Sequence, residues 1–304
     1  MKNIIFLFAT VQLCLSAYSQ TPGQLYNESL KNYKGKDFDN ALKLVEKSIK
    51  ADSNNGNAYY LRGLIYFSTY RYKEAIPDFD KTIALDLPED HVHYLRGASK
   101  EHVLDFKGAL ADYDIQLKIS PHEPENYFNL GNVRREMNDC QGAITDLDSA
   151  IQLNPNAPVY WTTRGIAKFT LQQFSEAAKD MDKAIALDSG FAPGYANRGF
   201  SRLLRKDYEG ALQDLNKCIK LDSSNVLVYF NRARAEYWLK DYKNALSDCN
   251  FVLISRPNDP NVLALRSSVL LPLGDKKGCC DDYRKSVQYG AQRLPAAETY
   301  CSLK

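Results

Sequence analysis

The residue types that most often carry enzyme chemistry are sparse in this chain of 304 residues. All four histidines lie in one stretch, at His91, His93, His102 and His122. His91 and His93 are two residues apart at an expected helix start, so their side chains point to different sides of the helix. The sequence contains no G-x-S-x-G or H-E-x-x-H motif and no phosphate-binding glycine loop. We therefore expect no enzyme activity, no metal site and no cofactor.

Charged residues of opposite sign do recur at fixed spacing. The arginines of this series are Arg62, Arg96, Arg164, Arg198, Arg232 and Arg266. The aspartates, which follow the arginine positions by 16 residues, are Asp78, Asp112, Asp146, Asp180, Asp214, Asp248 and Asp282. A guanidinium group can hold a carboxylate with two hydrogen bonds, so we expect a ladder of partly buried ion pairs between helices. The alternative is a row of arginines that binds phosphate or acidic ligands, and the matching aspartates disfavour it.

Small residues recur with a period of 34 residues, as the arginines and aspartates do. The first series comprises Gly63, Gly97, Gly131, Gly165 and Gly199, and twelve residues after its positions come Ala41, Ala75, Ala109, Ala143, Ala177, Ala211 and Ala245. A period of 34 is typical of a helix–turn–helix repeat. The pattern predicts eight repeats without insertion, at 22–55, 56–89, 90–123, 124–157, 158–191, 192–225, 226–259 and 260–293.

Each repeat carries two stretches with helical periodicity. Counting the first residue of a repeat as position 1, apolar residues fill one helical face in each half. Aspartates at position 16, such as Asp37 and Asp105, are suitable N-caps for the second helix. Prolines at position 32, such as Pro121 and Pro155, end it. The small residues at positions 8 and 20 are expected to face each other, because only small side chains allow two antiparallel helices to approach closely.

These features closely resemble the tetratricopeptide repeat family over about 272 of 304 residues, which is eight times 34. The resemblance implies an all-α fold, a right-handed α-solenoid whose stacked hairpins form a concave groove, and binding rather than catalysis. The first repeat departs from the pattern at Glu28 and Asn32, and the eighth at Lys276. Terminal repeats are expected to be atypical because they cap the stack.

The resemblance also places the concave wall on positions 2, 5, 9, 12 and 13 of the first helices. The aromatic candidates for a peptide-binding groove are Tyr26, Tyr60, Phe67, Tyr94, Phe128, Phe200, Phe230, Tyr237 and Trp238. The same rings can instead pack between neighbouring first helices. One binding mode of the family, a clamp for an acidic peptide C-terminus, requires lysine at position 5, where this chain never has it.

Two functions fit this wall. The first is an exported scaffold that binds a protein, as a peptide or helix, in the groove. The second is an accessory subunit of an envelope carbohydrate or export system, in which the aromatic rings stack on glycans beside Glu101, Glu125 and Glu136. With 39 basic and 37 acidic residues the chain is nearly neutral, so nucleic acid and anionic membranes are not expected partners.

The first nineteen residues are predicted to be a signal peptide. Lys2 precedes an apolar run from Ile4 to about Ala17, and small residues fit cleavage between Ser19 and Gln20. The run is too short to span a membrane comfortably, so the mature chain is expected to have no transmembrane segment. Lipidation at Cys14 is disfavoured because a small residue should precede it. The sequence therefore predicts a periplasmic or secreted protein.

An exported chain can form disulfides. After removal of the leader six cysteines remain, and Cys140, Cys218 and Cys249 fall in core positions where a thiol packs like an apolar group. Cys279 occupies the small-residue position 20. Cys280 points about 100° away from it, and residues 294–304 are expected to be a capping segment with a short helix from Ala296 to about Leu303. We predict a disulfide between Cys280 and Cys301 that ties this helix to the stack; two free thiols are the alternative.

Overall fold

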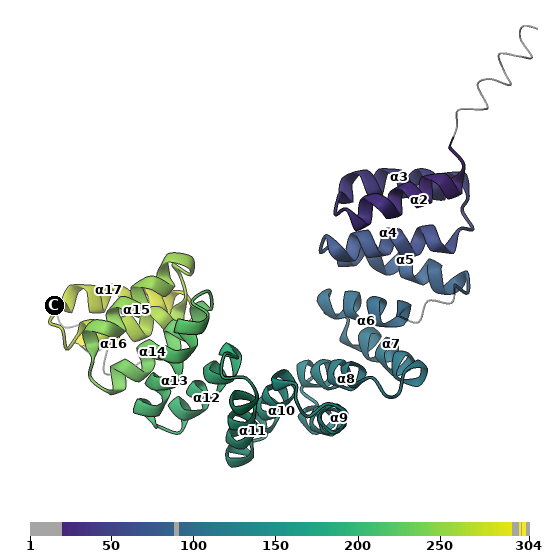
Figure 1. The fold of residues 1–304 in the computed structure, drawn as a ribbon. Coiled ribbons are helices and arrows are strands. Elements are labelled where there is room, and N and C mark those ends of the chain that lie inside the picture. Colours follow the sequence, from purple (N-terminus) through teal and green to yellow (C-terminus); the bar gives the residue numbers. More distant parts are fainter. Residues whose placement is uncertain (1–19, 88–90, 294–297, 299, 302–304) are drawn as a thin grey trace, which may run out of the picture. The chain divides into compact units, whose positions relative to one another are not determined.

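The computed structural model describes residues 20–87, 91–293, 298, 300 and 301. The predicted signal peptide, residues 1–19, lies outside the described residues. In the described part all regular structure is helical, in sixteen helices from α2 to α17 (Figure 1). The structure thereby confirms the predicted all-α fold of helical hairpins.

The helices follow the predicted repeats closely. They are α2 (Pro22–Lys34), α3 (Phe38–Ala51), α4 (Gly56–Ser68), α5 (Tyr72–Ala84), α6 (Val92–His102), α7 (Phe106–Ile119), α8 (Pro124–Glu136), α9 (Cys140–Leu153), α10 (Pro158–Thr170), α11 (Phe174–Leu187), α12 (Ala192–Leu204), α13 (Tyr208–Leu221), α14 (Val226–Trp238), α15 (Tyr242–Ser255), α16 (Pro260–Leu270) and α17 (Lys276–Gln288). Most first helices occupy positions 1 to 13, and most second helices occupy positions 17 to 30. The helices of most repeats therefore begin and end at the same repeat positions.

The caps of the second helices explain where these helices begin. The side chains of Asp37, Asp105, Asp207, Asp241 and Asp275 each accept a hydrogen bond from the backbone N–H three residues later. Such a bond satisfies a donor that the first turn of a helix leaves unpaired. The aspartates at position 16 are thus the N-caps that the sequence predicts.

The residue before each of these caps has an unusual backbone. Position 15 has a positive φ in every repeat, at Lys36, Tyr70, Leu104, Asn138, Gln172, Lys206, Lys240 and Gly274. A left-handed conformation lets the chain reverse within three residues, and it is unfavourable for residues with a Cβ atom. Glycine, for which this conformation is free of that penalty, occurs at this position in the last repeat alone.

The contacts divide the chain into two compact units, Met1–Asp139 and Cys140–Lys304. The sequence has no linker at this point and is interpreted as one continuous domain. Within each unit, consecutive helices pack against one another, and the first helices of neighbouring repeats also touch, as α12 and α14 do. The core of each unit lies in these seams, where the alanines at position 20 are fully buried.

The small residues at position 8 allow the two helices of a repeat to approach. A Cβ atom added to Gly63 would lie 2.7 Å from Cε1 of Phe79, which is itself fully buried. The nearest side chain is therefore at position 24, not at position 20 as the sequence suggests. Position 20 contributes its backbone instead: Ser29, at position 8 of the first repeat, donates a hydrogen bond to the Ala41 carbonyl at 2.7 Å.

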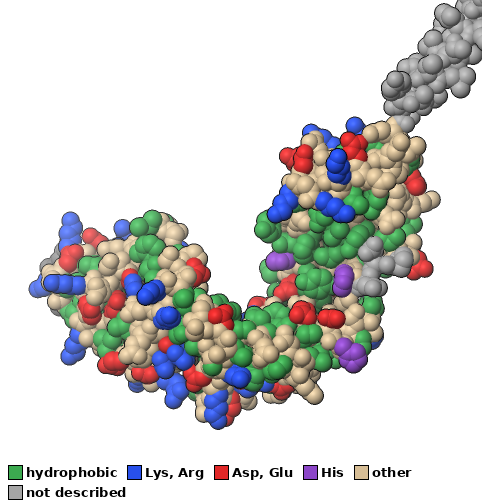
Figure 2. All heavy atoms as spheres, viewed as in Figure 1, with side chains coloured by type: hydrophobic (Ala, Val, Ile, Leu, Met, Phe, Trp, Pro, Cys, Tyr) green, Lys and Arg blue, Asp and Glu red, His purple; other side chains and the backbone are tan. Residues whose placement is uncertain are grey.

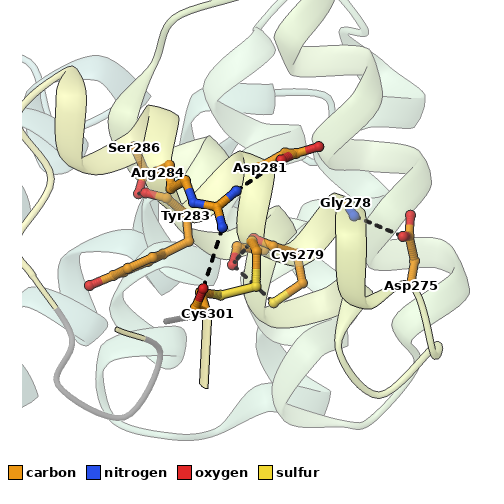
Figure 3. The surroundings of a disulfide bond; sticks show 10 residues. Asp275, Gly278, Cys279, Asp281, Tyr283, Arg284, Ser286 and Cys301 are labelled. Carbon is orange, nitrogen blue, oxygen red and sulfur yellow. Dashed lines mark hydrogen bonds and ion pairs between the residues drawn. A yellow bond between two sulfur atoms is a disulfide. The ribbon is translucent and has the colours of Figure 1, made fainter. Parts of the chain in front are cut away.

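The C-terminal end of the stack is held covalently (Figure 3). Helix α17 ends just before Gly290, which has a φ of +102°. Of the predicted capping helix, Glu298, Tyr300 and Cys301 are described, and all three are helical. The structure joins the two cysteines that the sequence selects: the sulfurs of Cys280 and Cys301 are 2.06 Å apart, and Arg284 donates a hydrogen bond to the Cys301 carbonyl at 3.3 Å. Four buried cysteines carry free thiols: Cys140, Cys218, Cys249 and Cys279.

The described surface carries both signs of charge. Figure 2 shows lysine and arginine side chains interspersed with aspartate and glutamate side chains on the visible face. In the described ranges, no helix combines the length and the apolar character needed to cross a bilayer.

Candidate peptide-binding groove

The arginine–aspartate ladder sets the position of each first helix. Arg232 donates from Nε and Nη2 to the two carboxylate oxygens of Asp248, at 2.7 and 2.8 Å. The same bidentate geometry joins Arg198 to Asp214 at 2.8 and 2.7 Å. These hydrogen bonds raise the pKa of both guanidinium groups, so the arginines stay charged. Because every arginine of the series holds an aspartate, the alternative role of a ligand-binding row is not favoured.

Each ladder arginine except that of the second repeat also reaches back to the preceding repeat. Its Nη1 atom donates to the residue at position 25 of that repeat, in the pairs Arg96–Asp80, Arg164–Asp148, Arg198–Asp182, Arg232–Asn216 and Arg266–Asn250, at 2.6 to 2.8 Å. The sequence analysis missed these acceptors, although position 25 repeats with the same period of 34. A single arginine thus sets both the pairing within a repeat and the register between repeats.

The groove candidates in the first unit are mostly packing residues. Tyr60 lies against Phe79 with ring centroids 6.3 Å apart, and Tyr94 lies against Tyr113 at 6.1 Å. The remaining candidates of this unit, Tyr26, Phe67 and Phe128, are partly buried. Tyr26 and Phe67 pack on the apolar core of their repeats. In this unit the rings serve mainly to fill the space between helices.

Two of the four candidates in the second unit line a pocket. Tyr237 packs on the core, and Trp238 is 58% exposed but stacks on Tyr208 with ring centroids 5.6 Å apart. Phe230 packs on the same core as Tyr237 and Phe200 contacts the ring of Phe169, but both also line a pocket. The structure therefore brings together two of the nine predicted aromatic residues at one cavity.

This pocket has a volume of about 440 Å³ and lies between the first helices α12 and α14. Its apolar walls include Phe200, Phe230 and Leu227, and Cys218 is also in its lining. The space exists because position 5 of the sixth repeat is Ala196, which also lines the pocket, whereas the corresponding residue of the seventh repeat is Phe230. A small residue beside two phenylalanines leaves room for an external side chain.

Two amides equip the pocket for a peptide backbone. Asn197 donates its Nδ2 to the Pro193 carbonyl at 2.9 Å, which leaves its Oδ1 as an acceptor. Asn231 accepts a bond of 3.4 Å from Arg234 through Oδ1, which leaves its Nδ2 as a donor. Apolar walls with a few fixed polar groups are typical of ligand sites in proteins.

The comparisons with known proteins agree with the repeat pattern. A family model described as tetratricopeptide repeat matches residues 32–87 and 128–196. The sequence search against curated proteins finds no match.

Several solved structures share the fold. The hetero-tetramer Cut9–Hcn1 of the APC/C has a TM-score of 0.67 over 92% of this chain at 14% identity, and this chain spans 55% of the length of that one. PilF of Pseudomonas aeruginosa has a TM-score of 0.59 at 17% identity, covering 68% of this chain and 94% of its own. A tetratricopeptide repeat protein of Parabacteroides merdae has a TM-score of 0.51 at 16% identity, covering 94% and 99%.

At these identities the structural similarity shows the fold alone, and that fold supports a scaffold for protein–protein interaction. The strict 34-residue period, the helical hairpins and the matching family model lead to one assignment. Residues 32–87 and 128–196 are assigned to the tetratricopeptide repeat family, and the other described repeats have the same helical-hairpin pattern.

Proposed function

We propose that this protein binds a polypeptide partner on the wall formed by the first helices of its second unit. The observation that carries the proposal is the pocket between α12 and α14, with its two phenylalanines and two amides. Aromatic rings in a recess provide anchors for large apolar side chains of a partner. The similar Cut9–Hcn1 structure is itself a protein complex, which supports a protein as the occupant.

We further propose that the protein is exported. The observation behind this is the pattern of the first nineteen residues, with a basic residue, an apolar run and a small-residue cleavage site. Cell fractionation followed by N-terminal sequencing tests it. We expect the protein outside the cytoplasm with Gln20 as its first residue, whereas cytoplasmic protein that begins at Met1 would contradict export.

The binding proposal is tested by crosslinking in intact cells. A photo-crosslinking amino acid at Leu227, which lines the pocket and is 49% exposed, should form an adduct with a polypeptide. The same group at Ile254, which is 82% exposed on α15 and does not line the pocket, is the reference position. An adduct that forms equally at both positions would count against a site in the pocket.

A pair of matched variants sharpens this test. Ala196→Phe fills the pocket at a position where the seventh repeat naturally has Phe230, so the helix should accept it. Ala264→Phe makes the same change at position 5 of the eighth repeat, outside the pocket. We expect A196F to abolish the Leu227 adduct and A264F to retain it, with similar thermal melts. Retention of the adduct in A196F would refute the proposed site.

A further inference from the structure

Arg234 is a pocket residue for whose charge the described residues supply no counter-ion. It lies in the third turn of α14, is partly buried and lines the pocket beside Phe230, whose ring centroid is 5.9 Å from its Cζ. Its Nη1 donates to the Asn231 amide at 3.4 Å, and no described carboxylate lies within ion-pairing distance of it. Burial lowers the pKa of this guanidinium, because its surroundings do not compensate the charge.

Arg232, on the same helix, has the counter-ion that Arg234 lacks among the described residues. Arg232, two residues earlier on the same helix, holds Asp248 with two hydrogen bonds and points into the seam between helices. Arg234 is turned toward the pocket by the helical spacing. A partly desolvated guanidinium has five N–H donors and binds a carboxylate more strongly when water is excluded.

The walls around Arg234 restrict what can accompany the carboxylate. Phe200 and Phe230 border the same cavity, so an apolar side chain next to the bound carboxylate would be buried between rings. We propose that the occupant of this pocket is a peptide segment in which a carboxylate stands beside a large apolar side chain, with the carboxylate bound by Arg234. This inference rests on the proposed function and names the chemistry of the partner.

The pocket also has a polarity that orients such a segment. Asp222 lines it just after the end of α13, and its bonds to Ser224 lower the pKa of its carboxyl, which keeps it ionised. Asp222 precedes α14 in the chain, whereas Arg234 lies eight residues after the first residue of α14, Val226. At 1.5 Å per residue this places Arg234 about 12 Å along the helix axis. The ligand carboxylate therefore belongs at the Arg234 end, and N–H groups or a basic side chain at the Asp222 end.

The carboxylate can come from an aspartate or glutamate side chain or from the C-terminus of the partner. Selection from libraries of random dodecapeptides on the folded protein (residues 20–304) distinguishes these sources. One library has free C-termini and the other has amidated C-termini. Enrichment in the free library alone indicates a terminal carboxylate, and enrichment of acidic residues in both indicates a side chain.

Three variants test the role of Arg234 on the enriched peptides. Arg234→Met removes the charge but keeps the length of the side chain, and Arg234→Lys keeps the charge without the planar fork. The exposed Arg205, changed to glutamine, controls for net charge. We expect R234M to weaken binding by about 10- to 100-fold, R234K to weaken it less, and R205Q to leave it unchanged. Thermal melts identify any variant that fails to fold.

The outcomes separate the two proposals. Enriched peptides that lack carboxylates, or equal binding by R234M and the unchanged protein, would overturn the inference about Arg234 and leave the groove as a peptide site. If A196F bound every enriched peptide as well as the unchanged protein does, both proposals would be overturned.

Discussion

Glu236 Oε1 lies 3.8 Å from Nε of Arg232, on a rung of the ladder that also holds Asp248. Glu236 occupies position 11 of its repeat, and the four preceding repeats have a lysine or arginine at this position. Three of these cations contact the ladder aspartate of their own repeat, in the pairs Lys100–Asp112, Lys168–Asp180 and Arg202–Asp214. In the seventh repeat the sign is reversed. Burial and the nearby Asp248 raise the pKa of Glu236 from 4.5 to about 8, and its Oε2 has no hydrogen-bond partner.

This reversal makes stability depend on pH. Because the folded state holds a proton that the unfolded state releases near pH 4.5, the free energy of unfolding should fall as pH rises from 4.5 to about 8. We expect Glu236→Gln to stabilise the protein by roughly 1–3 kcal/mol at pH 8 and to change little at pH 4. Urea titrations at both pH values measure this. The exposed Glu209, changed to glutamine, is the control, and an equal gain at both pH values for E236Q would contradict the explanation.

The ladder should be more sensitive to losing one partner than to losing both. Asp180 is 3% exposed and holds Arg164 and Lys168, so Asp180→Ala removes the buried carboxylate from two partly buried cations, of which Arg164 keeps its bond to Asp148. We expect a loss of about 3 kcal/mol, and a smaller loss for the double variant R164M/D180L. Denaturant unfolding tests this. The exposed Arg71–Glu74 pair is the reference, because E74A should give no measurable change. A double variant as unstable as D180A would argue against the pairing.

Two glycines at position 8 should respond differently to the same change. In Gly63→Ala the new methyl group meets the buried ring of Phe79 at 2.7 Å, so we expect a net loss of about 1–2 kcal/mol despite the gain in helix propensity. In Gly165→Ala the nearest atom, at 2.8 Å, is the flexible Cε end of Met181. The gain in helix propensity and the steric cost of the new methyl group should then cancel to within about 1 kcal/mol. Equal effects in thermal melts would show that the position 24 side chain does not decide the outcome.

The left-handed turns predict a pair of opposite effects. Leu104 has a φ of +65° and is 72% exposed, so Leu104→Gly should stabilise the protein by about 0.5–1 kcal/mol. Gly274 has a φ of +86° with open space around it, so Gly274→Ala should destabilise by about 1 kcal/mol for backbone reasons alone. Equilibrium unfolding measures both. If the two changes have the same sign, the turn conformation is not what sets the energy.

The Cys280–Cys301 bond should stabilise the end of the stack. It closes a loop of 21 residues in sequence separation, which corresponds to roughly 3 kcal/mol in the chain-entropy description. Cys301→Ser should therefore lower the melting temperature, and a reductant should have no further effect on this variant. Mass spectrometry of unreduced peptides establishes the bond directly. Recovery of peptides with Cys280 and Cys301 as separate free thiols would refute it.

Sequence reasoning was reliable for features that depend on residue type at fixed spacing. The two helices of each repeat, the caps at Asp37 and Asp105 and the bidentate arginine pairs all follow from side chains that recur every 34 residues. The left-handed turns could not be predicted from the sequence, because position 15 has no common residue type: it is Lys36 in one repeat and Leu104 in another. That conformation is imposed by the tight connection rather than by the side chain.

The pocket also escaped the sequence pattern, although two of its residues were among the candidates. An aromatic residue at position 5 or 9 faces neighbouring rings in some repeats and open space in others. The difference lies in the absence of a large side chain at Ala196, which a search for aromatic residues does not detect. Arg234 was not among the candidates because these were chosen for their aromatic rings, although it occupies position 9 of the predicted wall, as Phe200 does.

The bridges that five of the ladder arginines make to the preceding repeat bear on how the protein loses structure. In the second unit four successive bridges connect every repeat to the next, from Asp148 to Arg266, so opening one interface disturbs its neighbours. In the first unit the described bridge is Arg96–Asp80, and the fourth repeat has Leu130 where an arginine would continue the series. Stability in a repeat array depends on such nearest-neighbour coupling. We therefore expect the second unit to unfold more cooperatively than the first, and hydrogen exchange would register this as more uniform protection in the second unit.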